Sequence, residues 1–273
     1  MFKFVFLFWW SKSNKDNFGD ILTPYIAKKI SNSQIIKVSH PMHFIYRRWI
    51  KHYVCVGSII NTASTNSIVW GSGIIHNNQN IRRAKFLAVR GPRTHQRIKE
   101  LGYQINNVYG DPALILPLIF KPTVNQFKKI GIVPHIVDFN IVNNVDLSLD
   151  NYTIVNLLTN NIEQTVKAIC INEKVISSSL HGLIVAHAYG IPALWVKFSD
   201  NLAGDDTKFY DYLESVQIFN YTPPFLNTVS DLILDELFKN YSNFILPKKE
   251  IVNSIQIDLL NTCPFNDKLK TLV

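Results

Sequence analysis

The fold of this 273-residue chain is constrained most by an alternation of short apolar, β-branched runs with stretches of helical period. A strand followed by a helix and then by another strand builds a parallel sheet with helices on its faces. The pattern continues nearly to the end of the chain, without internal repeats or low-complexity segments. The sequence therefore predicts an α/β fold with parallel sheets.

The individual elements follow from residue period and from turn signals. The predicted strands are Phe2–Phe8, Ile35–Val38, Tyr53–Gly57, Ser67–Trp70, Phe86–Val89, Asn107–Tyr109, Ile130–Pro134, Tyr152–Leu157, Lys174–Ser177 and Ala193–Lys197. The predicted helices are Asp20–Ile30, Arg93–Leu101, Asn161–Cys170, Leu180–Tyr189, Asp206–Val216, Ser230–Asn240 and Lys248–Asn261.

The length of the chain suits two modest domains better than one large core. Pro117 and Pro122 interrupt the alternation, which makes residues 116–124 the expected linker. We expect two Rossmann-like domains facing a cleft, as in GT-B proteins: a basic acceptor-side domain over 1–118 and a donor-side domain over 126–215. Residues 216–273 would form a helical tail that can pack back on the first domain. Open parallel sheets bind ligands beyond the carboxyl ends of their strands, so both domains would contribute to the cleft.

A serine-rich turn at residues 177–179 lies between a predicted strand and a predicted helix. The helix is an apolar run with Gly190 and Pro192 as its stop signals. Free N–H groups and the positive end of the helix dipole gather at its start, which favours a bound anion. His181 stands at this point, and histidine can exchange protons near neutral pH. This turn is the strongest candidate site in the sequence.

The apolar N-terminal run and the cysteines bear on the location of the protein. The run over residues 2–10 is short and lacks a small-residue cleavage site, so we expect a buried strand rather than a signal peptide. Three widely spaced cysteines without a Cys-x-x-Cys pair indicate a reduced intracellular protein and argue against a zinc site. No run reaches the ~18–20 apolar residues of a membrane span.

The net charge of +8 is distributed unevenly along the chain. Residues 1–100 contain 16 Lys and Arg against 3 Asp and Glu, whereas the remaining residues contain 12 against 17. Much of the excess comes from two clusters, Arg47-Arg48-Lys51 and Arg82-Arg83-Lys85. The first half would therefore face an anionic partner or surface. An anionic membrane face, a diphosphate-bearing lipid and a merely solvated surface all fit; nucleic acid is disfavoured because no binding module for it is recognisable.

Two glycine motifs follow predicted strands and can border a ligand. In the first, Gly19 permits a tight turn with close backbone approach, and Asp20 serves either as a helix cap or as a catalytic base. The second, over residues 71–73, lacks the full dinucleotide fingerprint and a Walker lysine. From these motifs we expect acceptor contacts by Asn17, Gly19, Gly71, Ser72 and Gly73.

Further candidates lie at strand and helix ends. Arg90 ends a predicted strand just before a helix, and its planar fork suits carboxylate or phosphate. His135 either binds substrate or simply ends a strand, and Lys208 either reaches the cleft as a point charge or remains a surface lysine. Asp111, before Pro112, is expected mainly as a helix cap that borders the cleft.

Taken in chain order, these motifs resemble the polysaccharide pyruvyl transferase family. The resemblance runs from about residue 14 to about residue 215. Its most specific element is Ser-x-Ser-Leu-His-Gly at 177–182, followed by an apolar helix that ends in Gly-Ile-Pro. The motifs that carry the resemblance are Asn17-x-Gly19-Asp20, Gly71-x-Gly73, Arg90-Gly91, Gly110-Asp111-Pro112, Gly131-Ile-x-Pro134-His135 and Ser177-x-Ser179-Leu180-His181-Gly182.

The resemblance implies a GT-B-like fold and transfer of a pyruvyl group from phosphoenolpyruvate, without a further cofactor or a metal. Two hydroxyls of one sugar would be joined as a cyclic ketal, in a precursor of a capsule, exopolysaccharide or cell-wall polymer. Such acceptors are often linked to polyprenyl diphosphate. A cytoplasmic protein with peripheral contact at the inner membrane face is therefore expected, and the basic first half fits that location.

For this chemistry, His181 would act as acid and base, and Asp20 would orient or deprotonate the acceptor. Many family members carry an arginine where this chain has Ser179, so the group that holds the donor's charge is open. A nucleotide-sugar-dependent glycosyltransferase on the same scaffold and a non-catalytic glycan-binding relative remain as alternatives. The expected donor-binding residues are Arg90, His135, Ser177, Ser178, Ser179, Gly182 and Lys208.

Overall fold

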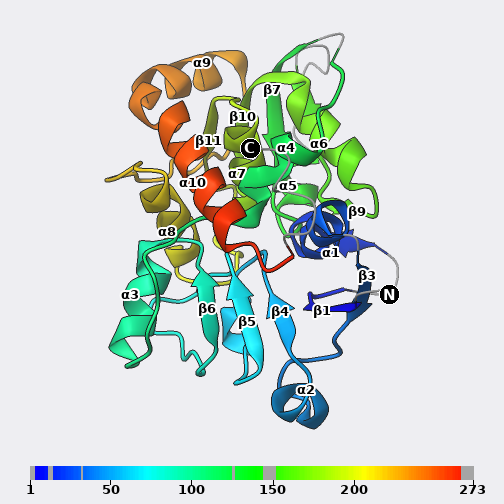
Figure 1. Ribbon diagram of the computed structural model, residues 1–273. Coiled ribbons are helices and arrows are strands. Elements are labelled where there is room, and N and C mark those ends of the chain that lie inside the picture. The colour runs from blue at the N-terminus through cyan, green and yellow to red at the C-terminus, as the bar shows by residue number, and fades with distance from the viewer. Residues whose placement is uncertain (1–3, 12–14, 32, 125–126, 144–151, 266–273) are drawn as a thin grey trace.

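The computed structural model describes residues 4–11, 15–31, 33–124, 127–143 and 152–265, and it contains two parallel sheets with helices packed around them (Figure 1). The predicted α/β class with parallel sheets is confirmed. A third, two-stranded antiparallel ladder pairs β2 (Asp16–Asn17) with β9 (Leu158–Thr159). This ladder joins a segment of the first sheet's half to a segment of the second.

The first sheet has the strand order β3-β1-β4-β5-β6, and all its pairs are parallel. Every one of these strands overlaps the run predicted for it. The strand predicted over Asn107–Tyr109 is wrong, because this segment meets the sheet only as an isolated bridge between Tyr109 and Val89, just past the end of β6. The strands are β1 (Phe4–Phe8), β3 (Gln34–Lys37), β4 (His52–Val54), β5 (Ser67–Trp70) and β6 (Lys85–Ala88).

The second sheet has the order β11-β10-β7-β8 and is also parallel. Its central strand β10 is buried over its last three residues, which is typical of a strand covered on both faces. The strands are β7 (Lys128–Val133), β8 (Tyr152–Ile154), β10 (Asn172–Ser177) and β11 (Ala193–Trp195).

The helices complete the alternation. They are α1 (Phe18–Ile30), α2 (Phe44–Arg48), α3 (Pro92–Glu100), α4 (Leu116–Ile119), α5 (Phe139–Asn143), α6 (Ile162–Cys170), α7 (Leu180–Ala188), α8 (Thr207–Ser215), α9 (Asp231–Asn240) and α10 (Lys249–Thr262), with 3-10 turns η1 (Ile60–Thr62), η2 (Pro112–Ile115) and η3 (Ser242–Phe244). Within the expected linker, α4 occupies the first residues and residues 120–124 have no regular structure.

Helix α1 begins two residues before its predicted start. Asn17 caps it, since the Asn17 side chain accepts the Gly19 N–H at 3.0 Å. The expectation that Asp20 caps this helix is therefore wrong, and Asp20 lies in the first turn instead. A carboxylate in the first turn still interacts favourably with the helix dipole.

The C-terminal helices contact both sheets. The Trp70 indole donates to the Leu259 carbonyl of α10 at 3.1 Å, and Gln256 of the same helix donates to the Leu114 carbonyl at 2.7 Å. Helix α9 lies at the amino end of the second sheet (Figure 1). There the Lys174 ammonium lies 5.0 Å from the centroid of the Phe238 ring. The tail therefore packs against elements of both halves of the chain.

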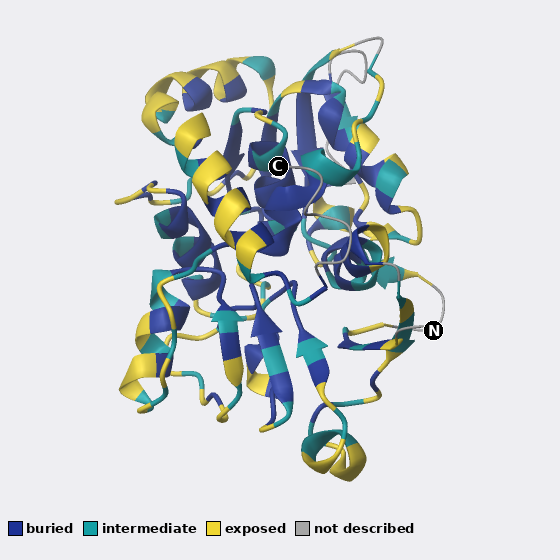
Figure 2. Cartoon of the chain, in the orientation of Figure 1, coloured by how far each residue is buried: buried dark blue, intermediate teal, exposed yellow. Residues whose placement is uncertain are grey.

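Two helices form the buried interior next to the candidate site. Phe18 and Leu22 of α1 and Leu183 and Ile184 of α7 are at most 1 % exposed and belong to one apolar cluster that extends through both halves. Burying each such side chain contributes about 1.5–3 kcal/mol. Figure 2 shows this interior in dark blue between the two sheets. The starts of both helices are thereby held in place.

Candidate active site

A cavity of about 220 Å³ opens where the carboxyl ends of strands from both sheets meet. Residues that follow β1, β4, β7 and β10 line it, and this edge is where parallel sheets bind ligands. It brings together six predicted site residues: Asn17, Asp20, His135, Ser179, His181 and Lys208. We call it the His181 cavity; its other lining residues are Trp10, Gly57, Ser58, Ile59, Ile75 and Leu180.

The His181 ring lies directly against Gly19. A Cβ atom built on Gly19 would stand 2.1 Å from His181 Nδ1 and 2.6 Å from Cε1, far inside van der Waals contact. Any side chain at position 19 would displace the ring. The two motifs that hold these residues are 162 positions apart in the sequence, and this contact explains why both occur in one chain.

A buried carboxylate stands behind the same ring. His181 Nε2 lies 3.7 Å from Asp111 Oδ2, and Asp111 is fully buried while the His181 side chain is 13 % exposed. Both atoms lack another hydrogen-bond partner among the described residues. The separation exceeds hydrogen-bond length, but catalytic hydrogen bonds are often long without substrate and tighten when it binds. Asp111 is thus placed to orient the imidazole.

The serine turn is held by its own side chains. Ser177 Oγ accepts the Ser179 N–H at 3.0 Å and lies 2.7 Å from the Val133 carbonyl oxygen. A Cβ on Gly182 would stand 2.4 Å from that same hydroxyl oxygen. Ser178 donates to Asp138 at 2.6 Å and accepts the His135 N–H at 2.9 Å. A role of Ser177, Ser178 or Gly182 in donor binding would therefore be indirect, whereas Ser179 lines the His181 cavity.

Arg90 is fully buried beneath the His181 cavity rather than on its wall. Its guanidinium donates to Asp211 at 3.0 Å, to the Ile74 carbonyl at 2.5 Å and to Ser58 Oγ at 2.5 Å. Gly73 is packed against this group, since a Cβ there would lie 2.5 Å from Arg90 Cζ. The donor contact expected of Arg90 therefore does not fit its geometry. Arg90 instead fixes Ser58, which lines the cavity.

The same ion pair fixes the helix that carries Lys208. Asp211 lies on α8 and also accepts hydrogen bonds from the Thr94 N–H and hydroxyl at 2.9 and 2.6 Å. These bonds lock α8 onto the start of α3. Lys208, nearly one turn earlier on α8, thereby reaches the His181 cavity. Its ammonium donates to the Ala203 carbonyl at 3.1 Å.

Two cationic candidates in the His181 cavity have lowered pKa values. Burial, followed by the nearby Arg90 charge, lowers the pKa of Lys208 to about 8. Lys208 is therefore largely charged at neutral pH. Burial and the Lys208 charge lower the pKa of His135 to about 4, so His135 is neutral there. Lys208 supplies a positive charge to the cavity, and His135 supplies a neutral ring.

The expected acceptor residues divide into two groups. Gly19 packs against the His181 ring, and Asn17 lines the His181 cavity. The 71–73 motif does not: Ser72 is fully buried and donates to the Gly57 carbonyl at 2.8 Å, and Gly71 has a φ of +90° with Pro112 packed against it. Its residues hold Gly57 and Arg90 in place, so direct acceptor contact by them does not fit their geometry.

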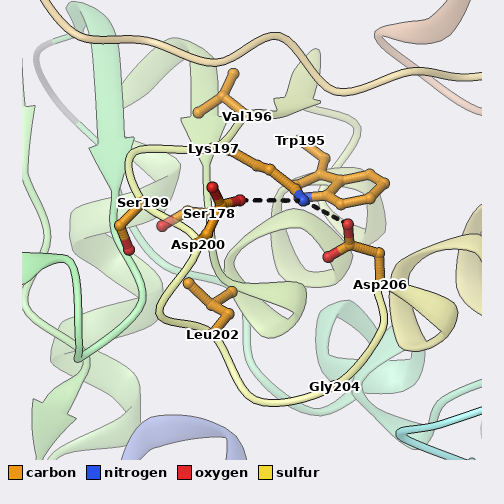
Figure 3. Close-up of a pocket in the computed structure, with 9 residues that line it drawn as sticks. All are labelled: Ser178, Trp195, Val196, Lys197, Ser199, Asp200, Leu202, Gly204 and Asp206. Carbon is orange, nitrogen blue, oxygen red and sulfur yellow. Dashed lines mark ion pairs between the residues drawn. The ribbon is translucent and has the colours of Figure 1, made fainter.

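A second, smaller cavity of about 130 Å³ lies on the other side of the serine turn (Figure 3). We call it the Lys197 cavity; its lining residues are Ser178, Trp195, Val196, Lys197, Ser199, Asp200, Leu202, Gly204 and Asp206. The charge of Lys197 is already neutralised by carboxylates, since Lys197 Nζ lies 2.5 Å from Asp206 and 3.8 Å from Asp200. Asp138, behind Ser178 and Ser199, adds a further buried carboxylate. This cavity is a poor match for an anion.

Three larger cavities, of about 680, 640 and 450 Å³, lie elsewhere. The largest lies beside the start of β6 and the end of α3. The other two include Pro117, Tyr189 and Gly190 and are lined largely by apolar side chains. They border the end of α7 and the starts of β10 and β11, which is the amino edge of the second sheet. All three are larger than the His181 cavity, but their linings contain few groups that could transfer a proton near neutral pH.

Three residues of the His181 cavity or its support have only a weak signal in the sequence. Asp111 is indeed a cap, with Oδ1 accepting the Ala113 N–H at 2.9 Å, but its other oxygen faces His181. Trp10 and Ser58 also line the cavity, and Trp10 is 50 % exposed. Position just after a predicted strand was the available signal for Trp10 and Ser58.

Among the described residues, no group of three or more His, Cys, Asp or Glu side chains could hold a metal ion. Within that part of the chain, none of the helices combines the length and the apolar character needed to cross a membrane.

Comparison with known proteins identifies the family of the chain. The family model for polysaccharide pyruvyl transferase matches residues 12–200, which is most of the chain. A relative, uncharacterized protein L143 of Acanthamoeba polyphaga mimivirus, is 31 % identical over 205 residues, covering 72 % of this chain and 70 % of the relative. The match supports pyruvyl transfer in polysaccharide biosynthesis, and the chain belongs to the polysaccharide pyruvyl transferase family.

Proposed function

We propose that the protein transfers the pyruvyl group of phosphoenolpyruvate to two hydroxyls of one sugar in a polysaccharide precursor, forming a cyclic ketal. One observation carries the proposal: His181 borders a small cavity, with the Asp111 carboxylate 3.7 Å behind its ring and Lys208 on the same cavity wall. The cavity is smaller than the roughly 300–1,000 Å³ of drug-sized ligand sites, which suits a small donor.

The donor carries a phosphate and a carboxylate on one carbon, so it needs several cationic or N–H donors. Lys208 supplies a charge, and the N–H groups of Leu180 and His181 in the first turn of α7 are available because they have no partner within the helix. Ser58 and Ser179 supply hydroxyls. Arg90, buried behind Ser58 and paired with Asp211, holds the Ser58 hydroxyl in place without direct contact to the donor. These groups take over from the arginine that many relatives carry at position 179.

The reaction needs one proton to be delivered and two to be removed. A proton added at C3 of the donor gives C2 oxocarbenium character, and the first sugar hydroxyl then bonds to C2. Phosphate leaves, and the second hydroxyl bonds to the same carbon. One of the two hydroxyl protons returns to the group that protonated C3. The other is carried away on the released phosphate. A single acid/base can serve both transfers, and such groups contribute ~10²–10⁴ in rate.

His181 is the group proposed for these transfers. If the Asp111 carboxylate receives the proton on Nε2, the lone pair is on Nδ1, the nitrogen on the Gly19 side. Asp111 is then a positioning residue that fixes the tautomer and stabilises the imidazolium. Asp20, which lines the same cavity, is placed to orient or deprotonate an acceptor hydroxyl.

For the acceptor we propose the rim formed by Trp10, Asn17 and Asp20. Trp10 is half exposed, and a flat aromatic face beside polar groups is a suitable surface for a sugar ring. This rim belongs to the first sheet's half, whereas the serine turn and His135 belong to the second. That division supports a GT-B-like arrangement of an acceptor lobe and a donor lobe, and a glycan on polyprenyl diphosphate as the acceptor.

The test is incubation of the protein with phosphoenolpyruvate and glycan precursors, lipid-linked or free, followed by mass spectrometry. We expect the acceptor to gain the mass of a pyruvyl ketal, and His181→Ala to abolish this product while leaving the thermal unfolding curve unchanged. His76→Ala, a change at an exposed histidine outside the cavity lining, is the matched control. Wild-type turnover by His181→Ala, or saturable binding of a nucleotide sugar without binding of phosphoenolpyruvate, would overturn the proposal.

A further inference from the structure

Helix α2 and the residues beside it form an unusual projection on the first sheet's half. None of the five residues of α2 is buried, and Phe44, Ile45 and Trp49 are 54, 47 and 73 % exposed. Figure 2 shows this projection as mostly exposed, at the end of the sheet from which β4 starts. Three large apolar side chains so close together on one projection need a partner surface, since scattered exposure of single residues is the usual case.

The projection is anchored rather than loosely attached. A five-residue helix is too short to be stable alone. Here the Arg47 carbonyl accepts hydrogen bonds from Asn66 Nδ2 at 3.0 Å and Thr65 Oγ1 at 3.1 Å. Tyr46 packs inward, edge-on to His52 with ring centroids 6.1 Å apart. The fold therefore holds the apolar side chains outward in a fixed arrangement.

The charge around the projection is of one sign. No Asp or Glu occurs between Asp20 and Glu100, whereas Arg47, Arg48 and Lys51 lie in or beside α2. Arg48 and Lys51 are exposed, and Arg48 Cζ lies 5.1 Å from the Phe44 ring centroid. A partner must therefore present negative charge at its surface and accept aromatic and aliphatic side chains beneath it.

We propose that the α2 surface, formed by Phe44, Ile45, Arg47, Arg48, Trp49 and Lys51, docks on an anionic phospholipid bilayer. Tryptophan is enriched at membrane–water interfaces, and each basic residue near an anionic leaflet adds attraction. Basic and aromatic groups together are the usual content of peripheral membrane contacts. The docking does not depend on the chemistry proposed for the His181 cavity.

The position of the α2 surface defines what docking does. It lies at the amino end of β4, whereas the His181 cavity lies at the carboxyl ends of the strands. Docking would therefore localise the enzyme at the membrane without seating lipid in the cavity. Consequently, turnover on a soluble acceptor should be the same for the wild type and for α2-surface variants.

The test is co-sedimentation of the full chain with vesicles of phosphatidylcholine alone or with 30 % phosphatidylglycerol added. We expect binding to the anionic vesicles only, weakened roughly 30-fold by Arg47→Gln/Arg48→Gln, as two lost attractions of ordinary size predict. Phe44→Ser/Trp49→Ser should weaken it by about tenfold or more. Two matched controls should change it less than about twofold: Lys248→Gln/Lys249→Gln, which removes the same charge at exposed positions, and Leu232→Ser, at an 85 % exposed residue of α9.

Several outcomes would overturn the proposal. They are equal binding to both kinds of vesicle, no binding to either, or equal losses in the control variants. Preferential binding of nucleic acid, or a dimer in light scattering that Phe44→Ser/Trp49→Ser dissolves, would assign the surface to another partner. Quenching of tryptophan fluorescence by brominated phospholipid, reduced in Trp49→Phe, would locate the contact independently. Thermal unfolding of each variant separates lost docking from lost folding.

Discussion

The two cavities on either side of the serine turn differ in how their lysines are paired. In the Lys197 cavity, the ammonium lies 2.5 Å from one carboxylate and 3.8 Å from a second. In the His181 cavity, Lys208 donates to a backbone carbonyl, and its pKa is lowered to about 8 by burial and by Arg90. The same turn contributes Ser178 to one and Ser179 to the other.

Charge pairing, rather than the presence of a lysine, therefore decides which cavity suits an anion. A compensated lysine stabilises its own loop and offers little to a ligand. A buried lysine without a close carboxylate gains most from an anionic partner, because the partner restores the charge that burial disfavours.

Gly19→Ala should lower pyruvyl transfer by about 100-fold or more, approaching the loss expected for His181→Ala. The added Cβ would stand 2.1 Å from His181 Nδ1 and would push the ring out of the His181 cavity. Alanine favours helix, so stability should be retained. Single-turnover kinetics measure the loss, and Lys28→Ala at an exposed position of α1 is the control. Turnover within threefold of wild type would show that the ring's place against Gly19 does not matter.

Arg90→Gln should lower the free energy of unfolding by about 3–5 kcal/mol, because it leaves the buried Asp211 carboxylate without its cation. Lys197→Gln breaks pairs that are partly exposed and should cost at most about 1 kcal/mol. Urea denaturation of the two variants measures both values. Equal losses would mean that the Arg90 and Lys197 ion pairs are equally buried in solution, contrary to their exposures in the structure.

Asp111→Asn should lower kcat by about tenfold or more with little change in the donor KM, because an amide no longer fixes the imidazole tautomer. The shape of the pH–rate profile should change as well, which a purely structural role would not produce. Asp138→Asn, beside the Lys197 cavity, is the comparison variant. If Asp138→Asn changed the pH–rate profile more than Asp111→Asn, the carboxylate that controls the reaction would be the one beside the Lys197 cavity, which would contradict the role given to Asp111.

The affinity for phosphoenolpyruvate should fall as pH rises through about 8. Lys208, whose pKa is lowered to about 8, is charged below that pH and loses its charge above it, so the attraction is present at lower pH and lost at higher pH. The dependence should approach about tenfold per pH unit. His135, with a pKa of about 4, adds no change in this range. Lys208→Met should bind weakly and without this dependence; a persisting dependence would assign it elsewhere.

Much of the site's location could be predicted from the sequence, because it follows from local patterns. The strand, serine turn and apolar helix predict where His181 stands, and observed α7 starts at the predicted Leu180. Helix α1 begins at Phe18 instead of the predicted Asp20. Both Asn17 and Asp20 are residue types that cap helices well, and the tertiary structure selects Asn17. The predicted strand over Asn107–Tyr109 failed for a similar reason, because pairing depends on what the sheet edge offers.

The partners of the predicted residues could not be found in the same way. The Arg90 guanidinium forms an ion pair with Asp211, which is 121 positions later in the chain. No local sequence signal links the two residues. Asp111 was correctly expected as a cap, but its second oxygen faces a ring from α7. Such contacts arise when two sheets place the ends of their strands at one edge, and single-sequence patterns report only what lies nearby along the chain.

The most direct test of the central claim is calorimetric titration of phosphoenolpyruvate into the wild type, Lys208→Met and Lys197→Met at pH 7. If the His181 cavity holds the donor, Lys208→Met should weaken binding by about tenfold or more, the loss of one charge-assisted contact, and Lys197→Met should change it less than about twofold. Weaker binding in Lys197→Met, with Lys208→Met unchanged, would contradict the account.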